Sequence, residues 1–149
     1  MNIRLYAPQD LAGILRLCKL EKWPSFLEDP ARANRALTAP GVTTMVAEEH
    51  TIIAGFAQLQ SDGEIQAHLS LIAVDPTYRR RGVARSLIVA ALNHAGGRRV
   101  DLVTDSAEHF YENLPHARMP GFRLYPEYTG PDRDHPGVMW KNGRKVLVG

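Results

Sequence analysis

The chain has 149 residues, of which 44% are hydrophobic and 23% charged. This balance predicts a single globular domain over residues 1–149 and excludes a disordered chain. The formal net charge of +2 argues against a uniformly basic surface for nucleic acid, and a single cysteine excludes an intramolecular disulfide.

The N-terminal part predicts a strand followed by two helices. Residues 2–8, NIRLYAP, alternate in polarity and end at a proline, as an edge strand does. Residues 9–23 carry apolar side chains at helical spacing, and Asp10 is the expected N-cap. Residues 28–41 predict a second, short helix that ends at a Pro-Gly pair.

The middle of the chain predicts three strands over residues 43–76. Turns are indicated at Glu48–His50 and at Asp62-Gly63, where glycine accepts the positive φ of a tight hairpin turn. Residues 82–97 then predict an amphipathic helix that a pair of glycines ends.

The remaining residues predict a strand over 98–105, a helix over 106–114 with Ser106 as its cap, and terminal strands over 121–128 and 137–149. The order of elements predicts a meander of antiparallel strands that leads into one β-α-β crossover. Such a chain forms a mixed sheet with helices packed on it.

The strand over residues 64–76, EIQAHLSLIAVDP, has one face that changes character along its length. One set of alternating residues is apolar and is expected to pack on helices: Ile65, Ala67, Leu69, Leu71 and Ala73. The other set is polar first and apolar later: Glu64, Gln66, His68, Ser70, Ile72 and Val74. This face predicts either a wet cleft or a plainly solvated face of the sheet.

The stretch DPTYRRRGVARSL, residues 75–87, joins this strand to the following helix. The loop and the first helical turn direct free N–H groups at one point, and the helix dipole adds positive potential there. Gly82 lets the backbone approach a ligand closely. The segment therefore predicts a site for a phosphate or pyrophosphate, although it matches neither a P-loop nor a dinucleotide fingerprint. A nucleic-acid contact and a solvated arginine cluster remain alternatives.

These residues resemble the acetyl-CoA-binding motif of the GNAT superfamily of N-acetyltransferases. The family pattern [QR]-x-x-G-x-[GA] corresponds here to Arg79 through Ala84, after a strand that ends in VDP. A second segment, TDSAEHFYENL at residues 104–114, is similar to the family's N-x-x-A-x-x-F-Y-E-x-L. The order of elements agrees along nearly the whole chain.

The resemblance implies an α/β (α+β) GNAT fold. This fold has a mixed, mostly antiparallel sheet of about 6–7 strands, helices on both faces and one β-α-β crossover at the CoA site. It also implies transfer of an acetyl group from acetyl-CoA to a primary amine. The implied cofactor-binding residues are Ile72, Ala73, Val74, Arg79, Arg80, Arg81, Gly82, Val83, Ala84, Arg85 and Thr104. Among them, the Ile72 N–H is the expected oxyanion donor.

The resemblance implies two catalytic residues. Tyr111 matches the family's tyrosine near the CoA sulfur and is the expected general acid; a plain core aromatic is the alternative. The strand position at which histone-type members carry a glutamate corresponds to His68, whose imidazole can accept a proton near neutral pH. Glu64 and Glu28 are alternative bases, and a structural histidine with no dedicated base is a further alternative.

The chain departs from the family pattern at two places. Thr104 replaces the family's asparagine at the end of a strand, so one cofactor contact is expected to differ. Residues 115–120, PHARMP, form an insertion before Gly121 and Phe122 that either shapes an acceptor pocket or is a surface loop.

The acceptor is expected between residues 22–30 and 126–140, where aromatic and acidic residues suit a cationic amine as well as ordinary loops. The aromatic and acidic residues in these segments, or directly before the second, are Trp23, Phe26, Glu28, Asp29, Tyr125, Tyr128, Asp132 and Asp134. The preferred prediction for the acceptor is a small-molecule amine. A protein N-terminus or lysine, and a CoA-sensing domain without catalysis, are the alternatives.

The sequence also lacks several motifs, and their absence leads to further expectations. No metal-ligand motif of the HExxH kind is present, so no catalytic metal is expected. The sequence has neither an apolar run of about 20 residues nor a secretory signal, so we expect a cytoplasmic protein without a membrane partner. We expect no nucleic-acid partner and leave a homodimer open.

Overall fold

A computed structural model of the chain describes residues 1–126, 134 and 137–148. Its main sheet has five strands in the order β1-β2-β3-β4-β5. The strands are β1 (Asn2–Leu5), β2 (Val42–Glu49), β3 (Ile52–Ser61), β4 (Gln66–Val74) and β5 (Arg99–Asp101). The first four strands pair antiparallel, whereas β4 and β5 pair parallel across the expected crossover.

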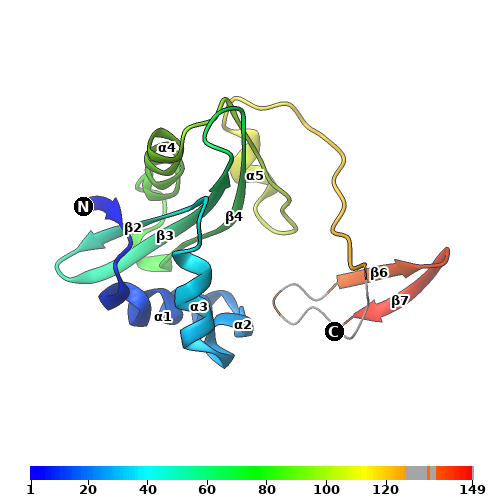
Figure 1. Ribbon diagram of the computed structural model, residues 1–149, viewed down its shortest axis with the longest axis horizontal. Helices are drawn as coiled ribbons and strands as arrows, with labels where there is room; N and C mark the ends of the chain where they lie inside the picture. The colour runs from blue at the N-terminus through cyan, green and yellow to red at the C-terminus, as the bar shows by residue number, and fades with distance from the viewer. Residues whose placement is uncertain (127–133, 135–136, 149) are drawn as a thin grey trace.

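Helices cover both faces of this sheet (Figure 1). The helical elements are η1 (Pro8–Asp10), α1 (Leu11–Glu21), α2 (Pro24–Glu28), α3 (Pro30–Leu37), η2 (Pro76–Tyr78), α4 (Val83–Ala95) and α5 (Glu108–Glu112). α4 lies on one face and α1 with α3 on the other, so the predicted arrangement of helices on both faces is confirmed. No helix in the described part of the chain is long and apolar enough to span a membrane.

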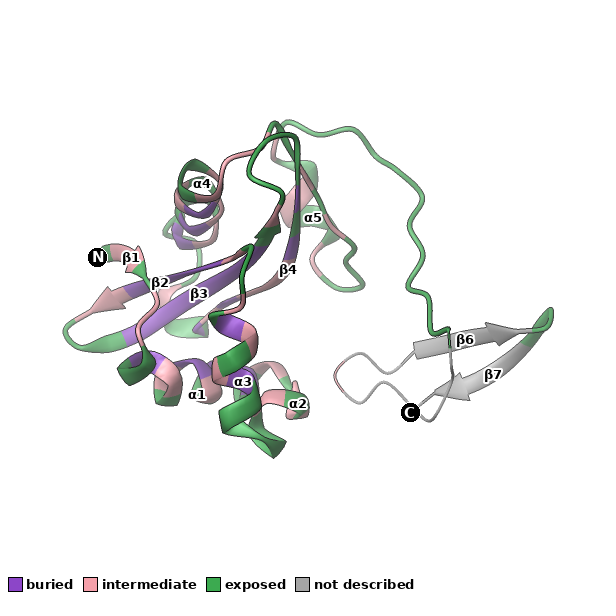
Figure 2. Cartoon of the chain, viewed as in Figure 1, coloured by how far each residue is buried: buried purple, intermediate pink, exposed green. Residues whose placement is uncertain are grey.

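Buried residues run through β2 and β3 and recur in α4 and α1 (Figure 2), and they form one core cluster on each side of the sheet. Met45 and Ala57 pack with Leu87 and Ala91 of α4. On the other side, fully buried Phe56 belongs to a second cluster, which joins α1 and α3 to the sheet. Because neighbouring residues of a strand point to opposite faces, the two strands β2 and β3 supply both layers.

Cys18 of α1 is the single cysteine and belongs to this second cluster. It is 1% exposed, as expected for a structural thiol. Burial, helped by the charges of Asp134 and Glu21, raises the pKa of the Cys18 thiol to about 12. The thiol is therefore protonated and unreactive at neutral pH.

Both predicted hairpin turns are present. His50 and Thr51 have φ of 49° and 67°, as a primed turn between β2 and β3 requires. Between β3 and β4, Gly63 has φ of 83°, and the Asp62 carboxylate accepts the N–H of Ile65 at 2.8 Å. Ile65 belongs to this turn and is 53% exposed, so its predicted packing on helices is wrong.

β4 contains a bulge at Ser70. Gln58 of β3 pairs with Leu71 and the next residue, Leu59, pairs with Leu69, so Ser70 has no partner of its own on β3. An extra residue shifts the period-two alternation by one position, which sends side chains beyond the bulge to the opposite face.

The bulge overturns the single apolar face expected for this strand. Ala67 and Leu69 pack on the α4 side of the sheet. Leu71 and Ala73 instead pack on the α1 side, while Ile72 joins the α4 side. His68, which alternates with Ala67 and Leu69, therefore does not share a face with Ile72.

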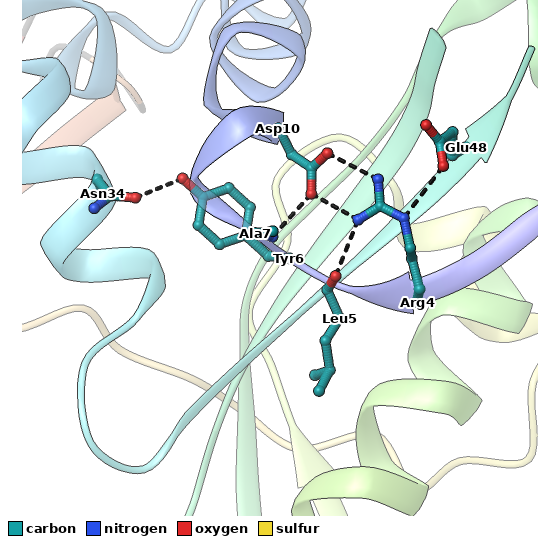
Figure 3. Close-up of polar contacts among 7 residues, drawn as sticks. All are labelled: Arg4, Leu5, Tyr6, Ala7, Asp10, Asn34 and Glu48. Carbon is teal, nitrogen blue, oxygen red and sulfur yellow. Dashed lines mark hydrogen bonds and ion pairs between the residues drawn. The ribbon is translucent and has the colours of Figure 1, made fainter. Parts of the chain in front are cut away.

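Asp10 precedes α1 as predicted, but it does not cap this helix (Figure 3). Its buried carboxylate accepts two hydrogen bonds from the Arg4 guanidinium, at 2.7 and 2.9 Å, and one from the Ala7 N–H at 2.8 Å. Arg4 also donates to Glu48 of β2 at 3.2 Å. Asp10 therefore ties β1 to the start of the helical layer.

The expected sheet of 6–7 strands is not confirmed, because the C-terminal strands lie apart from it (Figure 1). Residues 121–126 form no strand, and Phe122 and Leu124 are 86% and 81% exposed. The alternating pattern there lacks a neighbouring strand to pair with, since β5 ends at Asp101. The rest of that predicted strand, 127–128, lies outside the described residues.

Residues 137–149 were expected to form one strand and instead give two. These are β6 (Gly137–Lys141) and β7 (Arg144–Val148), a hairpin in which Lys141 pairs with Arg144. Asn142 and Gly143 have φ of 51° and 71°, which a primed two-residue turn requires. The Asn-Gly pair is the hairpin signal that a single-strand interpretation overlooks.

Candidate active site

A cleft of about 710 Å³ lies along β4 and is lined also by the loop before α4, by α5 and by the end of α1. The alternative bases Glu64 and Glu28 aside, all but one of the residues predicted to bind the cofactor or to act in catalysis line it. They are His68, Ile72, Ala73, Val74, Arg79, Arg80, Gly82, Val83, Ala84, Arg85, Thr104 and Tyr111. Arg81 is the exception.

The cleft opens where β4 and β5 separate. β5 pairs with β4 only from Gln66 to His68, so the rest of this edge of β4 has no partner strand in the described part of the chain. The Asp75 N–H donates to Ala54 of β3 at 2.8 Å, and backbone groups alternate in direction along a strand. The N–H and C=O groups of Ile72 and Val74 therefore face the open edge, as the oxyanion prediction for Ile72 requires.

The loop after β4 leads into the N-terminus of α4, which no side chain caps. Arg80 and Gly82 have φ of 61° and 76°. Gly82 is the N-cap of the 13-residue helix α4 and has no side chain to bind the free N–H groups of the first turn. A Cβ added at Gly82 would meet nothing within 4 Å, so this glycine borders open space.

Asp75 fixes the start of this loop. Its carboxylate accepts from the Thr77 N–H at 2.9 Å and pairs with Arg16 of α1 at 2.6 Å. Arg16 also donates to the Ile53 carbonyl of β3 at 2.7 Å. The hydrogen bond from the Thr77 backbone N–H and the one from the Arg16 side chain lower the pKa of Asp75, so the carboxylate stays charged at neutral pH.

The loop arginines point in different directions. Arg80 and Arg85 line the cleft without an ion pair to a described residue. Arg81 instead lies over the Tyr78 ring at 5.3 Å and approaches Glu49 at 3.9 Å. Arg79 donates from Nε to the Val74 carbonyl at 3.0 Å and from Nη2 to Glu21 at 2.9 Å.

Tyr111 of α5 also lines the cleft. Its ring meets the Phe110 ring edge-on, with centroids 4.9 Å apart, and both rings line the cleft. Tyr111 also packs against the α4-side core. Partial burial raises the pKa of the Tyr111 phenol, so its proton is retained at neutral pH.

Thr104 begins the turn that leads into α5. Its hydroxyl accepts from the Ala107 N–H at 3.0 Å, and Ala107 occupies the N-cap position. The predicted cap, Ser106, makes no such bond, because the helix begins later than the sequence pattern indicates. Thr104 thus orients the helix that carries Tyr111.

The predicted bases lie in different surroundings. His68 is exposed and lines the cleft, but on the face of β4 opposite Ile72. Glu64, in the turn before β4, and Glu28, at the end of α2, are exposed and do not line the cleft. Among the described residues, no three His, Cys, Asp or Glu side chains are grouped to hold a metal ion.

The expected acceptor region meets the cleft at Trp23. The Ser25 N–H donates to Asp134 at 2.8 Å, so the two sequence segments expected around an acceptor do come together. Tyr128 and Asp132 lie outside the described residues. Glu21, at the end of α1, and Arg123 line the cleft and were not anticipated, because neither belongs to a sequence motif.

The insertion at residues 115–120 folds back on α5. Arg118 pairs with Glu112 at 2.7 Å and also with Glu108. Gly121, directly after the insertion, lines the cleft beside Val103, which a Cβ at this position would meet at 2.9 Å. The insertion therefore borders the cleft while its own residues are exposed.

Solved structures share this fold. The aminoglycoside N-acetyltransferase AAC(6')-Iy in complex with CoA is 21% identical, with a TM-score of 0.68, over 85% of this chain and 99% of that one. A putative acetyltransferase from Agrobacterium tumefaciens is 24% identical, with a TM-score of 0.72, over 84% and 99%. An acetyltransferase from Trypanosoma brucei is 25% identical, with a TM-score of 0.64, over 83% and 98%.

The family of the chain follows from its sequence. We found no match among the curated proteins. The family model described as "Acetyltransferase (GNAT) domain" matches residues 6–119, which include the open strand edge, the glycine loop and Tyr111. The chain therefore belongs to the GNAT acetyltransferase family.

Proposed function

We propose that the protein is an N-acetyltransferase that moves an acetyl group from acetyl-CoA to a primary amine of a small molecule. The supporting observation is the open edge of β4, which lines one cleft together with Tyr111 and the glycine loop before α4. AAC(6')-Iy, whose fold is similar, is described in complex with CoA and with a bisubstrate analogue of CoA and acetylneamine.

The residues of the cleft fit a CoA thioester. Free N–H groups at the start of α4 and the positive charge of Arg80 and Arg85 suit a pyrophosphate. The open space beside Gly82 leaves room for it. The Ile72 and Val74 backbone groups on the open edge of β4 offer an amide-bearing chain the hydrogen bonds of a missing strand, once Arg79 releases the Val74 carbonyl.

Each chemical requirement of the transfer has a residue in the cleft. Bound acetyl-CoA supplies the acetyl group in activated form. The Ile72 N–H donates a hydrogen bond to the acetyl oxygen as negative charge develops there. Tyr111 donates its proton to the departing sulfur, and His68, through water in the cleft, accepts the proton of the amine.

Binding and turnover test this function in succession. CoA is titrated into the protein by calorimetry, with Gly82→Trp as the control variant. We expect saturable binding at one site, which the tryptophan abolishes by filling the space beside the loop. Thiol release from acetyl-CoA is then followed with neamine and other small amines, and with peptides that present a free N-terminus or lysine.

The outcomes separate the alternatives. Turnover of peptides alone would indicate a protein acetyltransferase, and CoA binding without turnover of any amine would indicate a sensor. No CoA binding by the folded wild-type protein would exclude the proposed function. The cytoplasmic location and the homodimer remain predictions, and light scattering after size exclusion would decide the second.

A further inference from the structure

Glu21 and Arg79 connect the two walls of the cleft. Glu21 is the last residue of α1, on the side where Trp23 lines the cleft, and Arg79 belongs to the loop before α4. Their side chains pair at 2.9 Å, and they are 29% and 52% exposed. A pair this open to solvent contributes little to stability, so a competing ligand can separate it.

Arg79 is engaged at groups that the donor substrate needs. Its Nε donates to the Val74 carbonyl at 3.0 Å, on the edge of β4 that is open for pairing. Its guanidinium also lies beside the loop proposed to hold a pyrophosphate. A bound donor therefore both competes with Arg79 for the Val74 carbonyl and attracts its charge toward the phosphates.

We infer that Glu21 is the residue that binds the ammonium group of the acceptor, and that donor binding makes it available by drawing Arg79 away. This inference rests on the proposed function and assigns it an acceptor class, a cationic amine. With Arg79 gone, the Glu21 carboxylate is a negative charge in a cleft wall that also holds the aromatic ring of Trp23. A carboxylate beside an aromatic ring is a favourable site for an ammonium group.

The same exchange makes the two substrates bind cooperatively. In the free protein Arg79 neutralises Glu21 and would repel a cationic amine. Once the donor holds Arg79, the amine meets an uncompensated carboxylate. Because coupling between two binding sites is reciprocal, the amine in turn strengthens donor binding.

The first test measures CoA affinity by calorimetry in Glu21→Gln. Removing the carboxylate frees Arg79 in advance, so we expect CoA to bind about two- to fivefold more tightly, the scale of one exposed ion pair. Glu49→Gln is the matched control, because Glu49 is 28% exposed, approaches Arg81 at 3.9 Å and does not line the cleft. It removes the same charge near the same loop and is expected to leave CoA affinity unchanged.

Unchanged or weaker CoA binding in Glu21→Gln would overturn the inference, as would equal tightening in both variants, which would indicate a general charge effect. In either case CoA still binds the wild-type protein, so the proposed function stands. No CoA binding by wild type would instead exclude the proposed function and this inference together.

The second test titrates neamine, a polycationic amine, into the wild-type protein with and without saturating CoA. We expect binding at least about threefold tighter with CoA than without it, and this difference should disappear in Glu21→Gln and persist in Glu49→Gln. Equal neamine affinity in wild type and Glu21→Gln, or no neamine binding to the wild-type CoA complex, would contradict the assignment of Glu21.

Discussion

His68 and Ile72 lie on opposite faces of β4, because the bulge at Ser70 reverses the alternation between them. Both residues nevertheless line the cleft, since the cleft runs along the open edge of the strand and not over one face. In the proposed function, a proton that leaves an amine near the Ile72 N–H would pass the strand edge to reach His68, through a water molecule in the cleft.

This geometry gives a test for the base. We expect His68→Gln to lower kcat/KM at pH 7 by about tenfold or more, because the amine then lacks a residue that accepts its proton. His94→Gln, an exposed histidine in the last turn of α4, is the control. A kcat/KM of His68→Gln equal to that of the wild type would show that the amine loses its proton without this residue.

Tyr111→Phe tests the general acid. Loss of the phenol proton is expected to lower kcat about 100-fold while CoA affinity stays unchanged, because the ring and its packing are retained. Burial raises the pKa of Tyr111 above its ordinary value of 10.0, so the acid form persists through neutral pH. Thiol release in the wild type should therefore show no loss from phenol ionisation below about pH 10. Full turnover by the phenylalanine variant would assign the ring a packing role only.

Replacing Ser70, the residue at the bulge, is expected to stabilise the protein. The Ser70 hydroxyl oxygen is buried and has no hydrogen-bond partner among the described residues. An unsatisfied buried hydroxyl costs about 1–3 kcal/mol, so Ser70→Ala should raise the free energy of unfolding by about 1 kcal/mol in urea titrations. Thr44→Val is the opposite case, since the Thr44 hydroxyl donates to the Leu37 carbonyl at 2.8 Å, and it should lower stability by a similar amount. A fall in stability for Ser70→Ala would mean that its hydroxyl is satisfied in solution.

Asp10 gives the stability a defined pH dependence. Hydrogen bonds from Arg4 hold the pKa of Asp10 below its ordinary value. A carboxyl group with a lowered folded-state pKa stabilises the protein above its unfolded pKa of about 3.9, and this contribution is lost as pH falls through the folded value. Asp10→Asn should therefore cost about 1–3 kcal/mol at pH 7, and its deficit should shrink below about pH 4. The exposed Asp101→Asn serves as control, and a deficit independent of pH would assign the loss to packing.

Local signals explain what could be predicted from the sequence. The site of the glycine loop follows from Gly82 and the helical pattern behind it, because both features act over a few residues. The position of Tyr111 follows from its segment for the same reason. The hairpin turns are equally local, and the structure has them where the Asp-Gly pair and the Glu-His segment indicate.

The features that could not be predicted from the sequence depend on pairing between residues that are distant in the chain. The bulge at Ser70 depends on the register of β4 against β3, which no residue within β4 reveals. Likewise, the ion pair of Glu21 with Arg79 joins residues 58 positions apart in the chain. The prediction of a strand that includes Phe122 and Leu124 was wrong for the same reason, since a segment with an alternating pattern forms a strand only beside another strand with which it can pair.

The concealed thiol of Cys18 has a practical consequence for the enzymology. A chromogenic thiol reagent will not react with the folded protein, so every equivalent of colour in a transfer assay reports CoA set free. Colour developed without substrate would instead count unfolded molecules in the preparation. Because Cys18 does not react in the folded protein, a cysteine introduced on the surface would be labelled selectively by a thiol-reactive fluorophore. Glu64→Cys, in the exposed turn before β4, is one such position.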